Sequence, residues 1–516
     1  MSKLKPRYRI KPGWLFIIAS LVCVVSGYGQ GGFSKLYLEG SGTSCILYDH
    51  PYILTAAQTE SSTGQAGVLF LKTDLSGTLL KADTFYLDTL HLYPGFQNAL
   101  IKIASNEYAL AAYSIPYSFI LKMDTNLQVT DTVRFDQEPS AGISLFQTNN
   151  NDLLLSGVTF KEDSVTQQFR KGFWCARYDS QLNLKWSSSF HTPSVNGKTV
   201  EQQAHNLMED SRGNLWLAGY RQGISKPHST DVLVMRLDSA GNKLHENTYG
   251  NANLSEGIGT VLETPDSNFL VVSSLGIELA NFAGETGTKG KVRIYKIDSA
   301  GSIIWDKVYG PKKLTNYISN AVVSSTGQVW ISGYYIDSET DFTVRKALFR
   351  SYAFKTNFNG DSLEYREYIA GTYQSDWNRF FDIDATPDGG FVAGGAFLST
   401  TNSPLTGGAG SHVWIVRADS FGCVVSGCQH ISLAEEEAAA RLQLYPNPTR
   451  GIFYLQGLPG QSAALKVYDA LGRELLNVTE VREKQAFSLS GQPAGLYLVE
   501  ILQNGRVIQR TKLMVE

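Results

Sequence analysis

Short apolar runs that alternate with polar residues fill most of the chain between residues 31 and 428. These runs are rich in Val, Ile and Tyr, and aromatic residues make up 11% of the sequence. Alternation with a period of two, combined with β-branched and aromatic residues, is typical of strands that bury one face. The pattern therefore predicts that the body of the protein is almost entirely β.

One unit of this pattern recurs seven times: a strand ending in Lys or Arg, an acidic or amide residue, a tight turn and a second strand. The turn residues are Asp74, Asp124, Asp179, Asp238, Asp298, Asn357 and Asp419. Successive copies lie 50, 55, 59, 60, 59 and 62 residues apart. A regular spacing of this size is the signature of a repeat architecture.

Each copy holds four strand candidates, which are clearest over residues 259–272 and 291–309 of the fifth copy. Four antiparallel strands repeated around an axis form a β-propeller, which typically has about four to eight blades. We therefore expect an all-β protein in which residues 30–428 form a seven-bladed β-propeller.

The segment FSKLYLEG at residues 33–40 resembles WDKVYG and LHENTYG, the outer strands of other copies, whereas the last copy ends weakly in CVVSGC. We predict that this N-terminal segment pairs with the final blade, near residues 412–424, because an unpaired sheet edge is a liability. Such pairing would close the ring.

The strand order assigns the connections to two rims. In an up-and-down blade, the first and third turns share one rim, and the second turn shares the other with the link between blades. The first and third turns are tight here, while the connections at 221–230, 276–291 and 398–411 are long. We expect one trimmed rim and one loop-rich rim, and loops gathered on one face often mark a binding face.

The N-terminus has the three-part layout of a secretory signal peptide: five basic residues between positions 3 and 11, an apolar run over residues 14–25, and small residues before Gln30. The apolar run is too short to span a bilayer comfortably. We predict removal of residues 1–29, leaving no transmembrane segment, and export through the periplasm. A lipid anchor at Cys23 is the alternative, but the bulky Val22 precedes it.

Four cysteines remain after that removal: Cys45, Cys175, Cys423 and Cys428. In an exported chain, the close pair of Cys423 and Cys428 suits a disulfide, and two buried thiols are the alternative. Neither spacing is that of a CxxC zinc site.

Composition excludes some functions. The formal net charge is -3 with 18% charged residues, so the chain lacks the basic stripe that nucleic-acid binding requires. No GxSxG or HExxH motif occurs, and the 8 His are scattered. We predict no cofactor, no metal site and no nucleic-acid partner.

After Cys428 the composition changes. Residues 429–441 are acidic and rich in Ala, which suits a linker. Residues 442–516 alternate apolar and polar positions between Gly and Pro turns, and this pattern predicts a small immunoglobulin-like β-sandwich.

Four segments of this module stand out: LYPNPTRG at 444–451, LKVYDALGREL at 465–475, SGQPAGLYLVEI at 490–501 and the end RTKLMVE. With these motifs, residues 442–516 resemble the C-terminal sorting domain of the type IX secretion system of Bacteroidetes-type bacteria. The resemblance implies that the secretion machinery is a partner, that the protein crosses the outer membrane, and that the domain is then commonly cleaved. The remainder is then released or fixed to surface lipopolysaccharide. An accessory sandwich without a transport role is the alternative.

Residues 31–428 carry DGG(F/Y)-like turns, a glycine after the second strand and a DxxGxxxW element. Gly219, Gly333 and Gly395 fit this pattern, as do Trp186 and Trp305. The region is similar to secreted bacterial propeller repeats of about sixty residues. The first two copies depart from the pattern because they are shorter and lack Trp. This resemblance implies the fold and no single chemistry.

The recurring turn acids have two interpretations. A ring of carboxylates on one rim would bind cations, or each acid caps its own turn by accepting a bond from the amide two residues on, with Gly77, Gly241, Gly301 and Gly360 completing the turns. We favour capping. The segment from Asp210 to Gly219 is close to an aspartate box, which is a structural motif, so we expect Trp216 and Trp330 to pack between blades.

One segment carries a candidate binding site. TYQSDWNRF places Tyr373, Asp376, Trp377 and Arg379 on a connection between blades, where an aromatic ring is able to stack on a sugar and charges are able to fix its hydroxyls. The alternative is that Trp377 begins the innermost strand and fills the centre of the ring, as Tyr317 does one copy earlier.

These observations predict a secreted or cell-surface binding protein, with a ligand-binding or adhesion role on its loop-rich face and a glycan or surface protein as the expected ligand. An extracellular hydrolase of glycans or peptides is the alternative, since propellers host such chemistry. Two or more carboxylates within about 10 Å at the mouth of the ring would favour it. A structural or adhesive component without a small ligand is a third hypothesis.

Overall fold

The computed structural model describes residues 32–39, 42–162, 169–193, 200–222, 230–250, 256–257, 259–275, 289–336, 349–371, 376–399, 410–425, 443–456, 463–469, 473–482, 485–503 and 506–516. These residues form strands and turns, and none of them is helical, which confirms the all-β class. The described part of the chain accordingly contains no helix that would cross a membrane. The chain divides into two compact units, Met1–His430 and Ile431–Glu516. The predicted signal peptide (1–29) and linker (429–441) lie outside the described residues.

The strands of the first unit are β1 (Phe33–Glu39), β2 (Thr43–Asp49), β3 (Tyr52–Glu60), β4 (Ala66–Asp74), β5 (Leu79–Phe85), β6 (Tyr93–Pro94), β7 (Leu100–Ala104), β8 (Glu107–Ser114), β9 (Tyr117–Asp124), β10 (Val129–Phe135), β11 (Ser140–Gln147), β12 (Leu153–Glu162), β13 (Phe169–Tyr178), β14 (Leu184–Phe190), β15 (Gln202–Glu209), β16 (Leu215–Gln222), β17 (Thr230–Leu237), β18 (Lys243–Tyr249), β19 (Thr260–Glu263), β20 (Phe269–Leu275), β21 (Lys289–Ile297), β22 (Ile303–Val323), β23 (Val329–Ile336), β24 (Phe349–Thr356), β25 (Ser362–Tyr368), β26 (Trp377–Ala385), β27 (Phe391–Ser399) and β28 (Gly410–Ala418).

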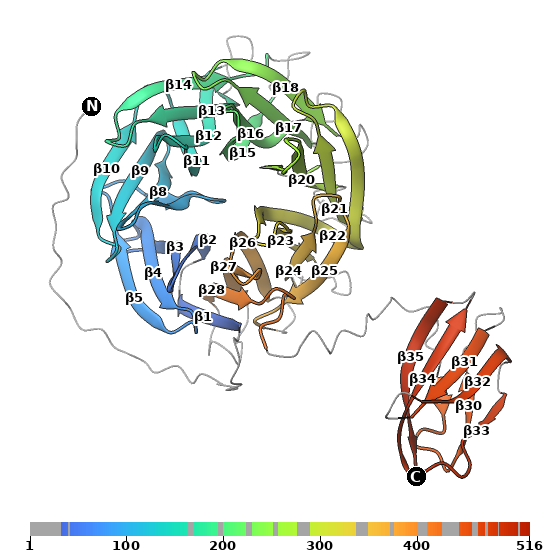
Figure 1. Ribbon diagram of the computed structural model, residues 1–516. Coiled ribbons are helices and arrows are strands. Elements are labelled where there is room, and N and C mark those ends of the chain that lie inside the picture. The colour runs from blue at the N-terminus through green and yellow to red at the C-terminus, as the bar shows by residue number, and fades with distance from the viewer. Residues whose placement is uncertain are drawn as a thin grey trace. The chain divides into compact units, whose positions relative to one another are not determined.

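Figure 1 shows these strands as sheets set around a common axis, with β2, β11, β15 and β26 toward the centre and β5, β10, β14, β18 and β25 toward the outside. Strands β2–β5, β6–β10, β11–β14 and β15–β18 form four separate sheets. Strands β19–β28 and β1 form one sheet for two reasons. β22 pairs with β21 through its first half and with β23 through its second, and β24 pairs with β26 through a parallel bridge. The predicted β-propeller is therefore the fold. Since the last groups share one sheet, the count of seven blades stays a prediction.

The ring is closed by its first strand. β1 pairs antiparallel with β28, from Phe33 opposite Arg417 to Glu39 opposite His412. The outer position beside β28 is thus filled by residues that precede the first repeat. The predicted closure by residues 33–40 is confirmed.

The acid of each repeated turn shapes that turn. Asp74 Oδ1 accepts bonds from the backbone N–H groups of Ser76 at 2.9 Å and Thr78 at 2.8 Å, while Gly77 adopts a φ of 76°. Asp124, Asp179, Asp238, Asp298, Asn357 and Asp419 make the same pair of bonds. The predicted capping role is confirmed.

The basic residue two positions before the turn acid binds the turn of the next repeat. Lys72 Nζ donates to the carbonyl of Thr125 at 3.0 Å, and Arg417 Nη1 of the last repeat donates to Leu75 of the first at 2.9 Å. The other members of this set are Lys122 to Ser180, Arg177 to Ser239, Arg236 to Ser299 and Lys355 to Ser420. We call these six bonds the turn latches. In the fifth repeat, Lys296 binds Asp266 of its own repeat instead.

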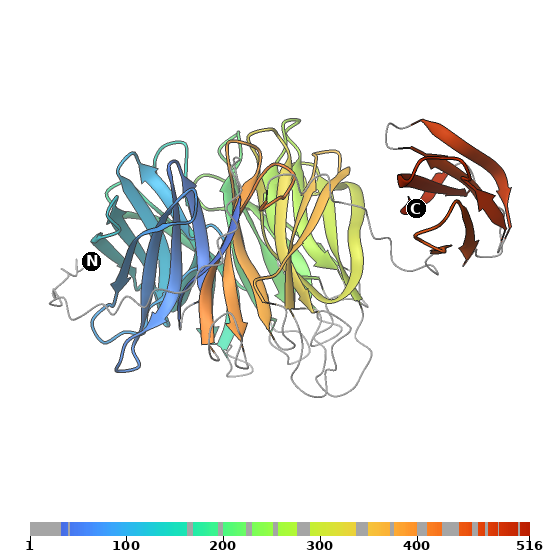
Figure 2. The same ribbon diagram turned by 90° about the horizontal axis from the view of Figure 1, so that it is seen from below.

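The turn latches identify the two rims. Because they join the third turns of successive repeats, those turns lie on one rim, and the opposite strand ends lie on the other. The long connections at 221–230, 276–291 and 398–411 begin and end at those opposite strand ends, for example between Ser399 and Gly410. Figure 2 shows the strands running between the two rims. Most residues of these connections lie outside the described residues, so the loop-rich rim stays a prediction.

A tyrosine near the end of several outer strands also binds the next turn. Tyr249 donates to the carbonyl of Gly301 at 2.7 Å, Tyr309 to Gly360 at 2.6 Å and Tyr368 to Gly422 at 2.7 Å. Tyr37 of β1 makes the equivalent bond to Gly77, at 2.7 Å. The similarity of the N-terminal segment to the outer strands thus extends to its hydrogen bonding.

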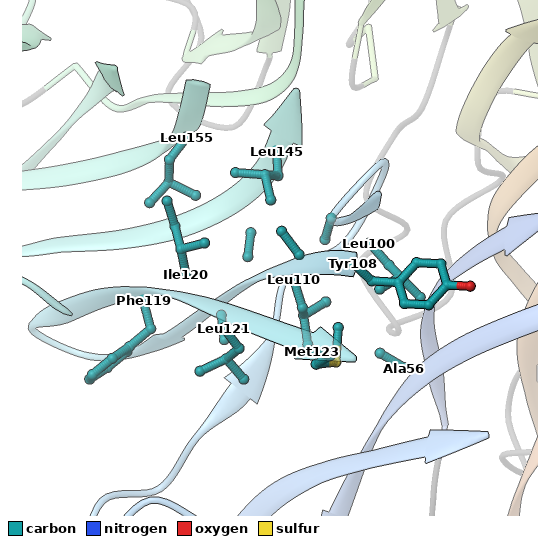
Figure 3. Close-up of a cluster of buried hydrophobic side chains, with 14 of the residues drawn as sticks. Ala56, Leu100, Tyr108, Leu110, Phe119, Ile120, Leu121, Met123, Leu145 and Leu155 are labelled. Atoms are coloured by element: carbon teal, nitrogen blue, oxygen red, sulfur yellow. The ribbon is translucent and has the colours of Figure 1, made fainter. Parts of the chain in front are cut away.

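Apolar side chains fill the spaces between sheets. Figure 3 shows Ala56 from the first repeat, Leu110 and Leu121 from the second, and Leu145 and Leu155 from the third in one cluster of buried side chains.

The two expected tryptophans occupy equivalent places. Trp216 packs on Phe269 of the next repeat at 4.0 Å between ring centroids, and Trp330 packs on Phe391 at 4.8 Å. Their predicted role between blades is confirmed.

The second unit consists of β29 (Gln443–Tyr445), β30 (Ile452–Gln456), β31 (Ala463–Tyr468), β32 (Glu474–Val481), β33 (Ala486–Ser488), β34 (Gly495–Gln503) and β35 (Arg506–Val515). These strands form two antiparallel sheets, ordered β29-β30-β33 and β32-β31-β34-β35. Side chains of both sheets, among them Phe453, Leu465 and Val499, share one buried core. This arrangement is the predicted small β-sandwich.

The cysteines differ in state. Cys423 is disulfide-bonded, whereas Cys428, its predicted partner, lies outside the described residues. Cys45 and Cys175 are free and buried. Burial raises the pKa of both thiols, so they are inert core residues.

Tyr37→Phe should destabilise the closed ring. The substitution leaves the Gly77 carbonyl without its buried partner, and the expected loss is about 1 kcal/mol in the free energy of unfolding. Thermal unfolding of the full chain measures it as a lower Tm. Tyr52→Phe is the matched control, because no described residue binds the Tyr52 hydroxyl. Equal Tm values for the two variants would contradict the closing role of this bond.

Candidate functional site

Four side chains from two successive repeats converge where β26 begins. Trp377 and Arg379 lie on β26, Tyr334 lies near the end of β23, and Phe349 opens β24. Phe349 is the register partner of both Ile336 and Trp377, so these strand ends lie together. They lie on the rim opposite to the turn latches. We call these four residues the Arg379 cluster.

Alternation along β26 produces this grouping. Asn378 and Phe380 are buried, whereas Trp377 and Arg379 are partly exposed. The Asn378 side chain donates to the Phe349 carbonyl at 2.9 Å and accepts from the Ala370 N–H at 2.7 Å. One amide side chain therefore fixes the chain that leads into β26 and ties it to β24, which holds the start of the strand in place.

Aromatic rings surround the guanidinium group. Arg379 Cζ lies 4.0 Å from the ring centroid of Phe349, 4.3 Å from that of Trp377 and 5.2 Å from that of Tyr334. Phe349 and Trp377 contact each other at 5.1 Å between centroids, and Tyr317 packs on Tyr334 at the same distance. Each such contact attracts the cation to the negative face of a ring, by about 0.5–2 kcal/mol.

Burial dominates the electrostatics of the cluster. It lowers the pKa of Arg379, although the two tyrosines oppose the effect, and it raises the pKa of Tyr334 to about 12. Arg379 has no hydrogen-bond acceptor and no ion-pair partner among the described residues, and its Nε is buried without a partner. The cation is therefore held by ring faces, while its N–H groups have no acceptor in the described ranges.

The structure brings two of the four predicted site residues together. Trp377 and Arg379 are in contact, and Trp377 is the first residue of an innermost strand, as the alternative interpretation expected. The Asp376 side chain is fully buried beside Gly371, where an added methyl group would lie 2.4 Å from Asp376 Oδ2. Asp376 thus offers no exposed carboxylate, and Tyr373 lies outside the described residues. The binding role of these residues stays a prediction.

Two members of the cluster, Tyr334 and Phe349, were missed by the sequence analysis. They belong to the second and third strands of the preceding repeat, about 30–45 positions before Arg379, and nothing in the local pattern pairs them with it. The only available signal was their place in the sequence, since Tyr334 lies near the end of β23 and Phe349 begins β24, on either side of the connection between these strands.

Polar side chains of the innermost strands form a second group. Asn320 Nδ2 donates to Asp382 Oδ1 at 2.7 Å and to Asn98 Oδ1 at 3.1 Å. Asn320 and Asp382 follow equivalent β-bulges in β22 and β26, whereas Asn98 belongs to the irregular second repeat. This chain of bonds joins the second, sixth and last repeats.

Two carboxylates connect β26 to β2 on the inner side of the ring; we call this contact between the two strands the inner seam. Asp382 Oδ2 accepts from the Ile46 N–H at 3.1 Å, and Asp384 Oδ2 accepts from the Tyr48 N–H at 2.8 Å, both on β2. Burial raises the pKa of Asp382 to about 7 and that of Asp384 to about 6. The described residues contain no group of three or more His, Cys, Asp or Glu side chains arranged to hold a metal ion.

Comparison with known families identifies the second unit. Residues 443–516 match the family described as "Secretion system C-terminal sorting domain". The predicted resemblance to a type IX sorting domain is confirmed over this range. The chain therefore carries a signal for secretion or for export to the cell surface. No protein of curated function matches the sequence.

Solved structures similar to the chain are distant. An α-L-arabinanase of Penicillium chrysogenum in complex with arabinobiose is 12% identical with a TM-score of 0.41, and the match covers 66% of this chain and 96% of that one. A puromycin-hydrolyzing peptidase of Mycobacterium tuberculosis is 11% identical, with a TM-score of 0.43 and coverage of 80% and 58%. The β-propeller domain of the Trilobed protease of Pyrococcus furiosus is 10% identical, with a TM-score of 0.37 and coverage of 69% and 92%. Similarity at this level says nothing about activity.

Asp382→Asn should remove a component of the pH dependence of stability. Because the pKa of Asp382 is raised when folded, the folded state holds its proton at a pH where the unfolded state has lost it, so stability falls as pH rises from about 4 to about 7. Relative to the variant, the wild-type protein should lose at most about 1.4 kcal/mol per pH unit in that window.

The measurement is Tm of both proteins at several pH values between 4.5 and 7.5. Comparing the two cancels other titrating groups, such as His205, whose lowered pKa of about 4 acts in the opposite direction. Asp388→Asn is the control, since it lies in the turn at the end of the same hairpin. A Tm difference that does not change with pH would contradict a buried, titrating Asp382.

Proposed function

We propose that this chain is a secreted or cell-surface binding protein that recognises a glycan through the rim carrying the Arg379 cluster. The sorting-domain match over residues 443–516 supports export. The observation that supports binding is the cluster itself. The partly exposed rings of Trp377 and Tyr334 and the buried ring of Phe349 surround a cation whose N–H groups have no protein acceptor among the described residues.

The side chains of the cluster have distinct roles in this proposal. The ring of Trp377 is partly exposed and offers an apolar face to the C–H groups of a sugar. Arg379 supplies donors that remain in a fixed plane, because its guanidinium rests on Phe349 and Trp377. Connections on the same rim, including the one that carries Tyr373, supply further contacts. A rigid ring whose connections each contribute a few contacts to a ligand is well suited to binding.

Hydrolysis of glycans or peptides is the alternative function, and the carboxylates of β26 bear on it. Asp382 and Asp384 are two residues apart on β26, so their Cα positions are about 7 Å apart along the strand. This separation lies in the range that a pair of glycosidase carboxylates requires. However, Asp382 is 1% exposed, and both carboxylates accept backbone N–H bonds from β2. A purely adhesive role without a small ligand is the third candidate. Because both acids are engaged in the inner seam between β26 and β2, we favour binding over hydrolysis.

The second unit has a separate role in the proposal. We assign residues 442–516 to delivery: they engage the type IX machinery after the chain has reached the periplasm with the help of residues 1–29. The strands of this unit pair only with one another among the described residues, so no strand of the ring depends on it.

Trp377→Ala should weaken binding on a glycan and matrix-protein array at least about tenfold, since loss of a stacking aromatic typically removes more than about 1 kcal/mol. Phe421→Ala is the matched control, because Phe421 is also exposed but lies in a turn on the rim that carries the turn latches, which we call the latch rim. We expect the control to bind as the wild-type protein does. Equal binding by all three proteins, or no bound ligand on the array, would contradict the proposed rim.

Removal of residues 443–516 should stop export. The truncated chain should accumulate in the periplasm of a host with a type IX system, because its transport signal is absent, while the full chain reaches the surface or the medium. Cell fractionation and surface proteolysis measure the difference. As a control, residues 431–516 fused to an unrelated periplasmic protein should carry it out. A truncated chain found at the surface would contradict this role.

A further inference from the structure

The guanidinium of Arg379 differs from those of several other arginines of the ring in how its charge is balanced. Arg177 pairs with Asp152 at 2.7 Å, Arg293 pairs with Asp306 at 2.6 Å and Arg417 approaches Asp388 at 3.4 Å. Arg379 has no such partner among the described residues, and its guanidinium lies against three aromatic rings. Within the described part of the chain, no carboxylate balances this cation.

The way in which the rings hold Arg379 determines what it is able to bind. Ring faces attract a guanidinium through its own face and leave the edge, with its N–H donors, unoccupied. A planar group with two acceptor oxygens matches that edge through two parallel N–H···O bonds. Partial burial strengthens such bonds, because fewer water molecules compete with the ligand.

We infer that Arg379 binds the carboxylate of an acidic sugar, with Trp377 stacked against the sugar ring. This inference deepens the proposed function and rests on it, since it names the class of glycan that the same rim would take. A neutral sugar leaves the cation unpaired and gains only the stacking contact, so the carboxylate should decide which glycans bind.

The neighbouring side chains fit this assignment. Asp376 and Asp382, the two acids closest in sequence, are both buried, and no exposed carboxylate of β26 competes for the cation. Tyr317 and Tyr334 complete the aromatic wall on the side of the preceding repeat, and burial raises the pKa of both, so that neither hydroxyl is ionised at neutral pH. An incoming anion therefore meets one positive charge and no fixed negative charge from these residues.

The decisive experiment uses the unaltered full chain and one ligand in two forms. Titration calorimetry compares trigalacturonic acid with its fully methyl-esterified form, which has the same rings and no negative charge. We expect the acid to bind at least about tenfold more tightly, since charge-assisted hydrogen bonds contribute about 1.5–3 kcal/mol. Equal affinity for the two forms would overturn the inference and leave a glycan-binding rim intact. Failure of both to bind, together with an empty glycan array, would overturn the proposed function as well.

Substitutions then locate the effect. Arg379→Gln should reduce the affinity for the acid to that for the ester, and Arg379→Lys, which keeps the charge but loses the planar edge, should fall between them. Arg212→Gln is the matched control, because Arg212 is exposed in a first turn on the latch rim. Acid-selective binding that survives in Arg379→Gln would place the anion elsewhere and overturn the assignment. A sulfated trisaccharide that binds as well as the acid would show that charge alone, and not the carboxylate, is recognised.

Discussion

A bond to a backbone carbonyl from the cationic side chain two positions before the turn acid holds every repeat of this ring except the fifth to the next one. Three parts of the repeated motif cooperate in it: the acid caps its own turn, the capped turn presents a carbonyl outward, and the Lys or Arg of the preceding repeat reaches that carbonyl. A single bond of this kind contributes little, about 1–3 kcal/mol. The closing bond from Arg417 to Leu75 joins the last repeat to the first, so the series continues across the point where the ring closes.

The two rims of the ring therefore differ in the interactions that their residues make. The latch rim is committed to contacts within the ring, since its acids cap turns and most of its basic residues bind carbonyls. At the opposite strand ends the described residues show no such repeated bonds, and there the sequence varies from repeat to repeat. The Arg379 cluster lies at that end, where a cation is stabilised by ring faces and its hydrogen-bonding edge is left without a partner among the described residues.

The features that could be predicted from the sequence are those that local chemistry determines. Turn capping by Asp74 needs only residues within four positions, and closure by β1 was visible because Tyr37 and its neighbours repeat the pattern of the outer strands. The turn latches were not predicted, because the motif shows the basic residue and does not show the carbonyl it meets. The partners of Arg379 were not predictable either, since Tyr334 and Phe349 reach it through the packing of two repeats. The same holds for Asn98 and Asn320, which are far apart in the sequence and meet only inside the folded ring.

The pairing of β1 with β28 has a consequence for maturation. Both strands of the closing pair belong to the first unit, and each described strand of the second unit pairs within that unit. A protease that cuts between the units would therefore separate two bodies without opening a sheet or exposing an edge. The propeller can lose the second unit and keep every described strand pair of its own sheets.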